Sequence, residues 1–488
     1  MKILLASSEV FPYSKTGGLG DMTGAMAKFL GRAGHQVGVV TPLYRGIRER
    51  FSGITKFDWY MDLPVGKHRV QAEVWTCEPH PRVTVYFIHQ PGFYDRAGLY
   101  HDDNWEYLDN PQRFIFLSKA VVHLARYLPW QPELVHVHDW QTALVPLFIR
   151  HQQTHEGWWN APGTCLTIHN LGYQGNYPPT VYELTNLPRD YFHMNGAELY
   201  GQFSFLKGGI SYADILTTVS PRYAREITTP TFGCGLDAAL RARRDALKGI
   251  LNGIDCEEWK TVNNPYLRNS FTARRLAGKT EEKLALQKEL GLPANAQVPL
   301  FANITRLTPQ KGMDILLGAL EEMLAADMQF VLLGSGYRDY EEAFHHLGQR
   351  FSQKAAVRIG FNQQLSQRIE AGADFYVMPS FYEPCGLNQM YSQRYGTIPI
   401  VRATGGLDDS VVDPSNDPKK ATGIKFNEYS VRALAKAIRK ALVLYQNPPI
   451  LRRFRVNGMK ADFSWERSTE QYSEVYAAVL KARNPIST

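Results

Sequence analysis

The chain has 488 residues, of which 44% are hydrophobic and 21% are charged, and its formal net charge is +7. This length exceeds a single hydrophobic core and predicts two or three domains, while the composition excludes a disordered or coiled-coil protein. The basic residues do not form one long block, which argues against nucleic acid as a partner. We therefore expect a soluble globular protein with ample length for an enzyme.

Cysteine usage and hydropathy predict the cellular compartment. The five cysteines are odd in number, widely spaced and without a C-x-x-C pair, so we expect neither a disulfide framework nor a zinc site. Glu9 and Pro12 cut short the first apolar run, and no stretch reaches the ~18 uninterrupted apolar residues that a membrane span needs. These features predict a cytoplasmic protein without membrane association.

The first predicted strand leads into a glycine turn. Apolar residues 3–6 are followed by Lys-Thr-Gly-Gly-Leu-Gly-Asp at residues 15–21 and then by a helical pattern. This order opens a βαβ unit in which backbone amides approach a phosphate. Gly17 and Gly18 lack the Cβ atoms that would block the approach, and Lys15 adds positive charge. The segment matches neither the dinucleotide fingerprint nor the P-loop, and a purely structural turn is the alternative.

Strand-like runs continue after this unit. Residues 36–40 predict a second parallel strand, and residues 51–94 contain runs that we interpret as hairpins inserted in the domain. The aromatic segment Gly-Phe-Tyr-Asp at residues 92–95 includes Tyr94 and is predicted as a loop. Its rings either stack on a sugar or cover an edge of the core.

Two further strands end in polar residues. The first ends at Asp139, and the second is followed by His169 and Asn170. Ligands of open α/β sheets bind at the carboxyl ends of the strands, so Asp139 and His169 are candidate functional residues, with a structural histidine as the alternative for His169. His136 and His138 share one face of the first strand, but no third ligand is near in the sequence, so a metal site is disfavoured.

A turn and a polar linker divide the chain. Leu-Asn-Gly-Ile-Asp at residues 251–255 marks the turn, and strands alternate with helices again over residues 298–406. The fold class is therefore α/β, with two doubly wound, Rossmann-like domains and a ligand cleft between them. A terminal helix begins near Ser464, its expected N-cap. The predicted parts are an N-terminal domain at residues 1–250, a C-terminal domain at residues 251–463 and a helical segment at residues 464–488.

The second half contains a candidate anion site. Arg306 follows a strand and Lys311 precedes a helix, so the two cations can hold a diphosphate near a helix N-terminus. The chain has no Asp-x-Asp motif, so we expect this site to work without a metal. Glu383 is expected to accept bonds from sugar hydroxyls or to offset positive charge, or simply to begin a helix. Cys385 is interpreted as a small residue in a tight turn.

Several segments carry a resemblance to a known family. They are Lys-Thr-Gly-Gly-Leu at 15–19, His-Asp-Trp at 138–140, His-Asn-Leu at 169–171, Leu-Asn-Gly-Ile-Asp at 251–255, Thr-Arg-Leu at 305–307, Gln-Lys-Gly at 310–312 and Glu-Pro-Cys-Gly-Leu at 383–387. In this order they resemble bacterial glycogen synthase and plant starch synthase over nearly the whole chain. The resemblance implies a retaining glycosyltransferase of the GT-B fold that moves glucose from ADP-glucose to the 4-hydroxyl at the non-reducing end of glycogen or another α-1,4-glucan. It implies no cofactor, and it implies that the terminal helix returns to the first domain.

The resemblance also implies roles for individual residues. The implied catalytic residues are His169, Glu383, Asp139, Arg306 and Lys311, and the implied substrate-binding residues are Lys15, Gly17, Gly18, Tyr94, Asn170, Cys385, Gly386 and Leu387. His169 would lie near the anomeric centre, Asp139 on the acceptor side and Glu383 against the donor sugar. In the family mechanism, the acceptor attacks on the face that the departing phosphate leaves. That phosphate takes the acceptor's proton, so no carboxylate nucleophile is required.

Three positions depart from the expected pattern. Gln141 replaces a histidine and Asn388 replaces a threonine, but both keep hydrogen-bonding side chains, so activity is still expected. Tyr391 replaces the second glutamate of the related Glu-x7-Glu pattern, which disfavours sucrose-synthase-like and trehalose-forming enzymes. The alternatives are a GT-B transferase that uses UDP-glucose or a small acceptor, and a catalytically silent glucan-binding protein. A nicotinamide oxidoreductase is disfavoured because the dinucleotide fingerprint is absent.

Overall fold

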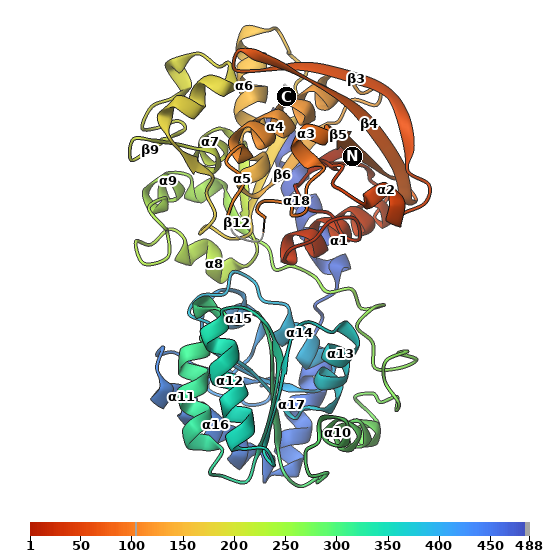
Figure 1. Cartoon of the computed structure of the whole chain (residues 1–488), viewed down its shortest axis with the longest axis vertical. Coiled ribbons are helices and arrows are strands. Elements are labelled where there is room, and N and C mark those ends of the chain that lie inside the picture. Colours follow the sequence, from red (N-terminus) through yellow and green to blue (C-terminus); the bar gives the residue numbers. More distant parts are fainter. Residues whose placement is uncertain (103–104, 484–488) are drawn as a thin grey trace. The chain divides into compact units, whose positions relative to one another are not determined.

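The computed structural model of the protein describes residues 1–102 and 105–483, so the end of the predicted segment 464–488 lies outside the described residues. The chain divides into two compact units (Figure 1). Unit 1 comprises Met1–Val219, Ala224–Gly253 and the segment from Trp465 on, and unit 2 comprises Ser220–Tyr223 and Ile254–Ser464. Each unit is built on a largely or wholly parallel sheet with helices, which confirms the predicted α/β fold class.

Unit 1 contains, within its described residues, a nine-stranded sheet in the order β12-β11-β7-β6-β1-β2-β5-β4-β3. Its strands are β1 (Lys2–Ala6), β2 (Gln36–Pro42), β3 (Thr55–Val65), β4 (His68–His80), β5 (Val83–His89), β6 (Leu134–His138), β7 (Gly163–Ile168), β11 (Ile215–Thr218) and β12 (Leu247–Gly249). All pairs from β12 to β5 are parallel, while β4 and β3 add an antiparallel hairpin that extends the sheet (Figure 1). A small antiparallel sheet joins β8 (Asn176–Tyr177), β9 (Glu198–Leu199) and β10 (Gln202–Ser204).

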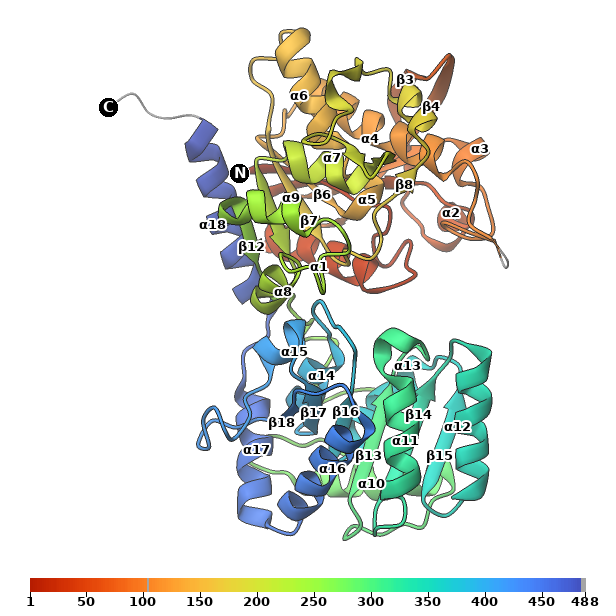
Figure 2. The same ribbon diagram turned by 90° about the vertical axis from the view of Figure 1, so that its left-hand side faces the viewer.

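The helices of unit 1 include the last helix of the chain. They are α1 (Gly18–Arg32), α2 (Ile47–Arg50), α3 (Pro91–Tyr94), α4 (Asn110–Tyr127), α5 (Asp139–Thr142), α6 (Val145–His155), α7 (Phe205–Tyr212), α9 (Asp237–Ala242) and α18 (Trp465–Arg483), and α8 (Pro221–Glu226) spans the division between the units. Helix α18 runs along unit 1 (Figure 2) and buries Tyr472, Tyr476 and Val479. The Trp465 ring stacks on Phe29 of α1, with ring centroids 6.4 Å apart.

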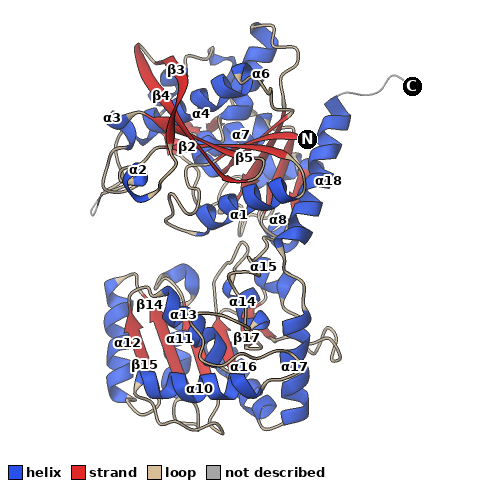
Figure 3. Ribbon diagram, turned by 90° about the vertical axis from the view of Figure 1, so that its right-hand side faces the viewer, coloured by secondary structure: helices blue, strands red, loops and turns tan. Residues whose placement is uncertain are grey.

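Unit 2 contains, among the residues described, a six-stranded sheet in the order β15-β14-β13-β16-β17-β18 (Figure 2), whose strands are drawn in red in Figure 3. The strands are β13 (Leu300–Ile304), β14 (Gln329–Gly334), β15 (Ala355–Ile359), β16 (Phe375–Met378), β17 (Ile398–Arg402) and β18 (Ile424–Phe426). All of its pairs are parallel. Numbered from β13, this is the strand order 3-2-1-4-5-6 of doubly wound nucleotide-binding domains.

Helices cover both faces of the unit 2 sheet. They are α10 (Ala277–Leu290), α11 (Met313–Met323), α12 (Arg338–Arg350), α13 (Gln363–Gly372), α14 (Asn388–Arg394), α15 (Gly405–Ser410), α16 (Val431–Tyr445) and α17 (Pro448–Lys460). Figure 1 shows the sheet edge-on, with α11, α12 and α16 on one face and α10 and α13 on the other. Two separate apolar clusters fill these layers, because strands buried on both faces carry apolar side chains in both directions.

Each sheet has a point where the strand order reverses. In unit 1 the chain builds outward from β1 toward β5 and then restarts at β6 on the other side of β1. In unit 2 it builds from β13 toward β15 and restarts at β16. Such switch points leave a crevice at the carboxyl ends of the strands, where ligands of this fold class bind. Among the described residues, no helix is both long and apolar enough to cross a membrane.

Candidate functional site

The glycine turn after β1 closes onto a carboxylate of its own unit. Glu9 is only 3% exposed, and its Oε2 accepts hydrogen bonds from the backbone amides of Thr16 at 2.6 Å and Gly17 at 3.3 Å. Its Oε1 accepts from the hydroxyl groups of Thr16 at 2.6 Å and Tyr100 at 2.7 Å. Gly17 was predicted to let the backbone approach a phosphate, whereas its amide bonds to Glu9, to which no sequence pattern pointed. Open space beside Gly18, where an added Cβ would meet no atom within 4 Å, leaves that part of the turn accessible.

Lys15 lies on the exposed side of the same turn. Its Nζ pairs with Asp21 in the first turn of α1 at 2.6 Å, and it lies 5.7 Å from the centre of the Phe11 ring. Partial burial raises the pKa of Asp21, and the nearby Lys15 charge opposes that rise. Lys15 is thus a surface cation with one carboxylate partner, held beside the helix N-terminus.

Asp139 joins the carboxyl ends of β6 and β7. Its Oδ1 accepts a hydrogen bond from the backbone amide of His169 at 2.7 Å, and the amide of Asn170 also donates to this carboxylate. Asp139 has a φ of 54°, in the left-handed region that a residue with a Cβ rarely adopts. Burial raises the pKa of Asp139 to about 7 despite these two bonds. The carboxylate therefore holds the backbone that carries His169.

Three histidines form a row at this edge, in which His136 and His138 are buried and His169 is partly exposed. His138 Nδ1 lies 3.2 Å from His169 Nε2, and the rings of His136 and His138 are 4.2 Å apart. His136 bonds to the hydroxyl of Tyr476 at 2.7 Å and to that of Thr167 at 2.6 Å. Burial lowers the pKa of His136 and of His169 to about 3 and that of His138 well below its usual range, so all three are neutral at pH 7.

Tyr94 and Asn170 are engaged by the protein itself. Tyr94 is fully buried in the short helix α3, where the sequence analysis expected a loop, and its hydroxyl donates to the carbonyl of Arg113 at 2.9 Å. A substrate contact of the Tyr94 ring remains a prediction that requires the ring to be uncovered. The side-chain oxygen of Asn170 accepts from the amide of Gly172 at 3.0 Å, which stabilises the loop after β7.

In unit 2, Lys311 and Glu383 form a partly buried ion pair. Lys311 Nζ lies 2.6 Å from Glu383 Oε2, and the two side chains are 18% and 6% exposed. The hydroxyl of Ser380 also donates to Oε2, at 3.0 Å. Gly312 follows Lys311 with a φ of 71°, and a Cβ there would lie 2.2 Å from the carbonyl oxygen of Pro379. This close approach fixes the Lys311 turn against the segment that follows β16.

Arg306 follows β13 at the same switch point. Its side chain is exposed and forms no hydrogen bond or ion pair with the rest of the described chain. Asn388 donates to the carbonyl of Ile304 at 2.7 Å and to the hydroxyl of Tyr376 at 2.6 Å. Asn388, one of the departures from the family pattern, therefore supports the end of the strand that precedes Arg306.

The turn after Glu383 is tightly packed. Cys385 is buried, and Gly386 has a φ of 69°, which favours glycine. A Cβ at Gly406 would lie 2.1 Å from the carbonyl oxygen of Cys385. Leu387 leads directly into α14. The backbone of this turn therefore leaves no space for a Cβ at Gly406, while the interpretation of Cys385 as a small residue stays a prediction.

The structure thus places the candidates in two groups at the two switch points. Glu9, Asp139 and His169 lie at the ends of neighbouring strands of unit 1, and Arg306 and the Lys311–Glu383 pair lie at the ends of neighbouring strands of unit 2. Among the residues that the structure describes, no group of three or more His, Cys, Asp or Glu side chains could hold a metal ion.

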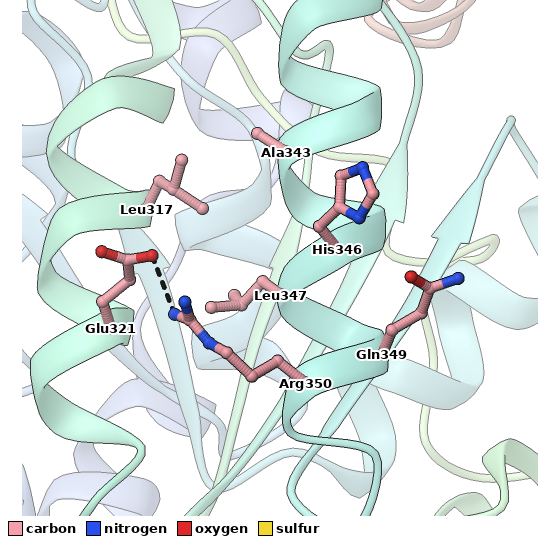
Figure 4. Close-up of a pocket in the computed structure, with 7 residues that line it drawn as sticks. All are labelled: Leu317, Glu321, Ala343, His346, Leu347, Gln349 and Arg350. Atoms are coloured by element: carbon pink, nitrogen blue, oxygen red, sulfur yellow. Dashed lines mark hydrogen bonds and ion pairs between the residues drawn. The ribbon is translucent and has the colours of Figure 1, made fainter.

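An open groove of about 630 Å³ lies elsewhere, between α11 and α12 (Figure 4). Glu321 and Arg350 form an ion pair of 2.8 Å across it. None of the predicted site residues lines this groove. It is a feature of the helix layer rather than of the carboxyl edge of the sheet.

Two family models match the chain. The model described as starch synthase catalytic domain matches residues 2–242, and the model described as glycosyl transferases group 1 matches residues 287–460. The first match lies almost wholly in unit 1 and the second lies in unit 2.

Individual relatives match over nearly the full length. Glycogen synthase from Anaeromyxobacter sp. (strain Fw109-5) is 45% identical over 480 residues, which cover 98% of this chain and 99% of that protein. Glycogen synthase from Syntrophotalea carbinolica is 41% identical over 481 residues, 99% of each. Among solved structures, the catalytic domain of starch synthase IV from Arabidopsis thaliana, bound to ADP and acarbose, is similar with a TM-score of 0.89 at 32% identity. That similarity covers 98% of this chain and 99% of the Arabidopsis chain.

Proposed function

The chain belongs to the family of glycogen and starch synthases, as its motifs predict, and we propose that it transfers glucose from ADP-glucose to the non-reducing end of an α-1,4-glucan. The relatives named glycogen synthase span nearly its whole length, and the similar Arabidopsis domain was solved with ADP and acarbose. The observation that carries the proposal is the partly buried Lys311–Glu383 pair at the switch point of a sheet with nucleotide-binding strand order.

We assign the donor diphosphate to Arg306, Lys311 and the Lys15 turn. The exposed guanidinium of Arg306 can bind phosphate oxygens with two parallel N–H bonds, and Lys311 adds a point charge. Both bonds to Glu383 use its Oε2, which leaves Oε1 for a hydroxyl of the donor sugar. Gly17 and Gly18 follow Lys15 in unit 1, and Cys385, Gly386 and Leu387 follow Glu383 in unit 2, so we propose that each turn contributes to substrate binding in its own unit.

The reaction follows from where charge develops. When the bond between the glucose C1 and the phosphate oxygen breaks, negative charge gathers on the departing ADP, where Arg306 and Lys311 stabilise it. The 4-hydroxyl of the acceptor attacks C1 from the face that ADP leaves, and the departing phosphate oxygen takes its proton. A new α-1,4 bond and ADP result. Neither a carboxylate nucleophile nor a metal is needed for this sequence.

We assign the transferred glucose and the acceptor side to unit 1. His169 is partly exposed at the edge of the sheet and neutral, which suits a hydrogen bond to a sugar hydroxyl. Asp139 supports His169 by accepting a hydrogen bond from the backbone amide of His169.

We propose that the protein acts in the cytoplasm without nucleic acid or membrane partners. All five cysteines lie in the described part of the chain, and none forms a disulfide there.

The first experiment measures incorporation of labelled glucose into glycogen from ADP-glucose and from UDP-glucose, side by side and without added metal. We expect strong transfer from ADP-glucose. Transfer from UDP-glucose but not from ADP-glucose would show that UDP-glucose is the donor and that the assignment of ADP-glucose is wrong. A folded protein that transfers from neither donor but still binds glycogen would be the catalytically silent glucan-binding protein, and the proposal would be wrong.

A further inference from the structure

A hydrogen bond joins two neutral imidazoles at the carboxyl edge of unit 1. His138 Nδ1 lies 3.2 Å from His169 Nε2. A neutral imidazole carries one N–H and one bare nitrogen, so one ring must donate and the other must accept. Either His138 donates from Nδ1 and His169 keeps its proton on Nδ1, or His169 donates from Nε2 and His138 keeps its proton on Nε2.

The surroundings of His138 distinguish these two arrangements. His138 is fully buried, and its Nε2 has no hydrogen-bond partner within the described residues. The second arrangement would leave an N–H donor buried without an acceptor, whereas the first leaves only a bare nitrogen. Orphaned buried N–H donors are the rarer of the two.

The neighbouring ring offers His138 no alternative acceptor. Both nitrogens of His136 are already bonded, one to the hydroxyl of Tyr476 at 2.7 Å and the other to the hydroxyl of Thr167 at 2.6 Å. Burial keeps all three histidines neutral, so a doubly protonated ring does not provide a third arrangement. The first arrangement is therefore the one that satisfies the donors.

We propose that His138 is a positioning residue that holds His169 in the tautomer protonated on Nδ1. His169 Nδ1 makes no hydrogen bond to another described residue, and His169 is partly exposed, so this nitrogen is the one left for a ligand. His169 then presents an N–H donor to a hydroxyl of the transferred glucose. This last step rests on the proposed function, but the tautomer itself does not.

The tautomer is measured directly on the full-length protein labelled with 15N-histidine. Long-range 1H–15N correlation spectra distinguish Nδ1–H from Nε2–H rings, and His138 and His169 are assigned from the signals lost in His138→Asn and His169→Gln. We expect both rings to be protonated on Nδ1. Protonation of both rings on Nε2 overturns the proposal, whatever the enzyme transfers.

A variant pair then tests the positioning role. His138→Leu removes the donor, whereas His138→Asn keeps an amide N–H near the position of Nδ1. We expect His169 to lose the Nδ1–H tautomer in His138→Leu and kcat to fall about tenfold, the effect of one hydrogen bond, with partial rescue in His138→Asn. An unchanged His169 tautomer in a folded His138→Leu overturns the positioning role. A changed tautomer with unchanged kcat and KM overturns the donor role of His169.

Discussion

The Lys311–Glu383 pair links stability to function at a single contact. Removal of one partner of a buried ion pair leaves an uncompensated charge, which typically costs about 3–5 kcal/mol. Glu383 would keep only the hydroxyl of Ser380 as a donor. A single alanine substitution at such an ion pair therefore lowers stability and activity together, so the loss of activity alone does not identify a catalytic role.

We expect Lys311→Ala to lose most turnover and to lower the free energy of unfolding of unit 2 by about 3 kcal/mol, measured by urea denaturation. The double variant Lys311→Ala with Glu383→Gln removes both charges, so it should recover most of the stability but none of the activity. A Lys311→Ala protein as active as the parent would remove Lys311 from the anion site. A double variant no more stable than the single one would show that the buried charge is not the cause.

Asp139 makes a second prediction at this scale, from its raised pKa. The folded state holds the Asp139 proton up to pH about 7, whereas an unfolded aspartate loses it near pH about 4. Between these values the folded state binds more protons, so the contribution of Asp139 to stability falls as pH rises from about 4 to about 7 and is constant above. The buried histidines act in the opposite sense, because their folded pKa values are lowered.

The difference between the parent and Asp139→Asn isolates this contribution. Asparagine keeps an oxygen that accepts from His169 and tolerates the left-handed backbone. We expect the stability of the parent to fall by a few kcal/mol between pH 4 and 7 relative to that of Asp139→Asn, because the variant lacks the titrating carboxyl group. Urea midpoints across that range measure the difference. Asp245→Asn is the control, because the Asp245 side chain is 98% exposed. Parallel pH curves for all three proteins would contradict the prediction.

At the scale of elements, the turn before α11 depends on one glycine. Gly312 combines a φ of 71° with a carbonyl oxygen 2.2 Å from any added Cβ. Gly291, at the end of α10, has a similar φ of 79° but nothing within 4 Å of an added Cβ. A comparison of alanine substitutions at these two glycines therefore distinguishes the cost of backbone strain from the cost of a steric clash.

We expect Gly291→Ala to cost about 1 kcal/mol of stability, the penalty of the left-handed backbone alone. Gly312→Ala should cost at least about 3 kcal/mol, because the methyl group displaces the segment after β16, and it should also lower kcat by moving Lys311. Urea denaturation and the glucose-transfer assay provide the two readouts. Equal costs for both substitutions would mean that the contact with Pro379 relaxes freely.

The elements show what the sequence can and cannot predict. Strands β13 and β17 lie within residues 298–406, where alternating strands and helices were predicted, because each is a short apolar run between turn residues. Helices α16 and α17 were missed, although Ser430 caps α16 through the amide of Ala433 and apolar side chains recur along one face. The pairing of the β3–β4 hairpin with the main sheet could not be predicted, since strand periodicity defines faces but not partners.

The candidate site was predictable to the same limited degree. Asp139, His169 and Arg306 were predicted from their positions after β6, β7 and β13. Ligands of parallel sheets bind at the carboxyl ends of the strands, and this rule needs only the positions of the strands in the sequence. Glu9 was missed, since its partners in the glycine turn follow it by several residues and depend on how the loop folds back. The burial of Tyr94 depends on Arg113 and the loop packed around it, which no local pattern encodes.

At the scale of the whole molecule, each unit has its own core and its own switch point. Unit 2 is nearly continuous in sequence, whereas unit 1 takes its last helix from the far end of the chain. The contact between Tyr476 and His136 joins residues separated by 340 positions. The resemblance to glycogen and starch synthases implied this return of the terminal helix, and composition alone did not.

The discontinuity of unit 1 sets an order of events during synthesis. The chain of unit 2 ends at residue 464, so α18 is the last element of unit 1 to be synthesised. The His136 ring gains its hydrogen bond to the Tyr476 hydroxyl only once α18 is present. The row of histidines that ends at His169 is therefore completed last. A chain that stops before α18 therefore contains all of unit 2 but lacks the Tyr476 hydroxyl that binds the first ring of the histidine row.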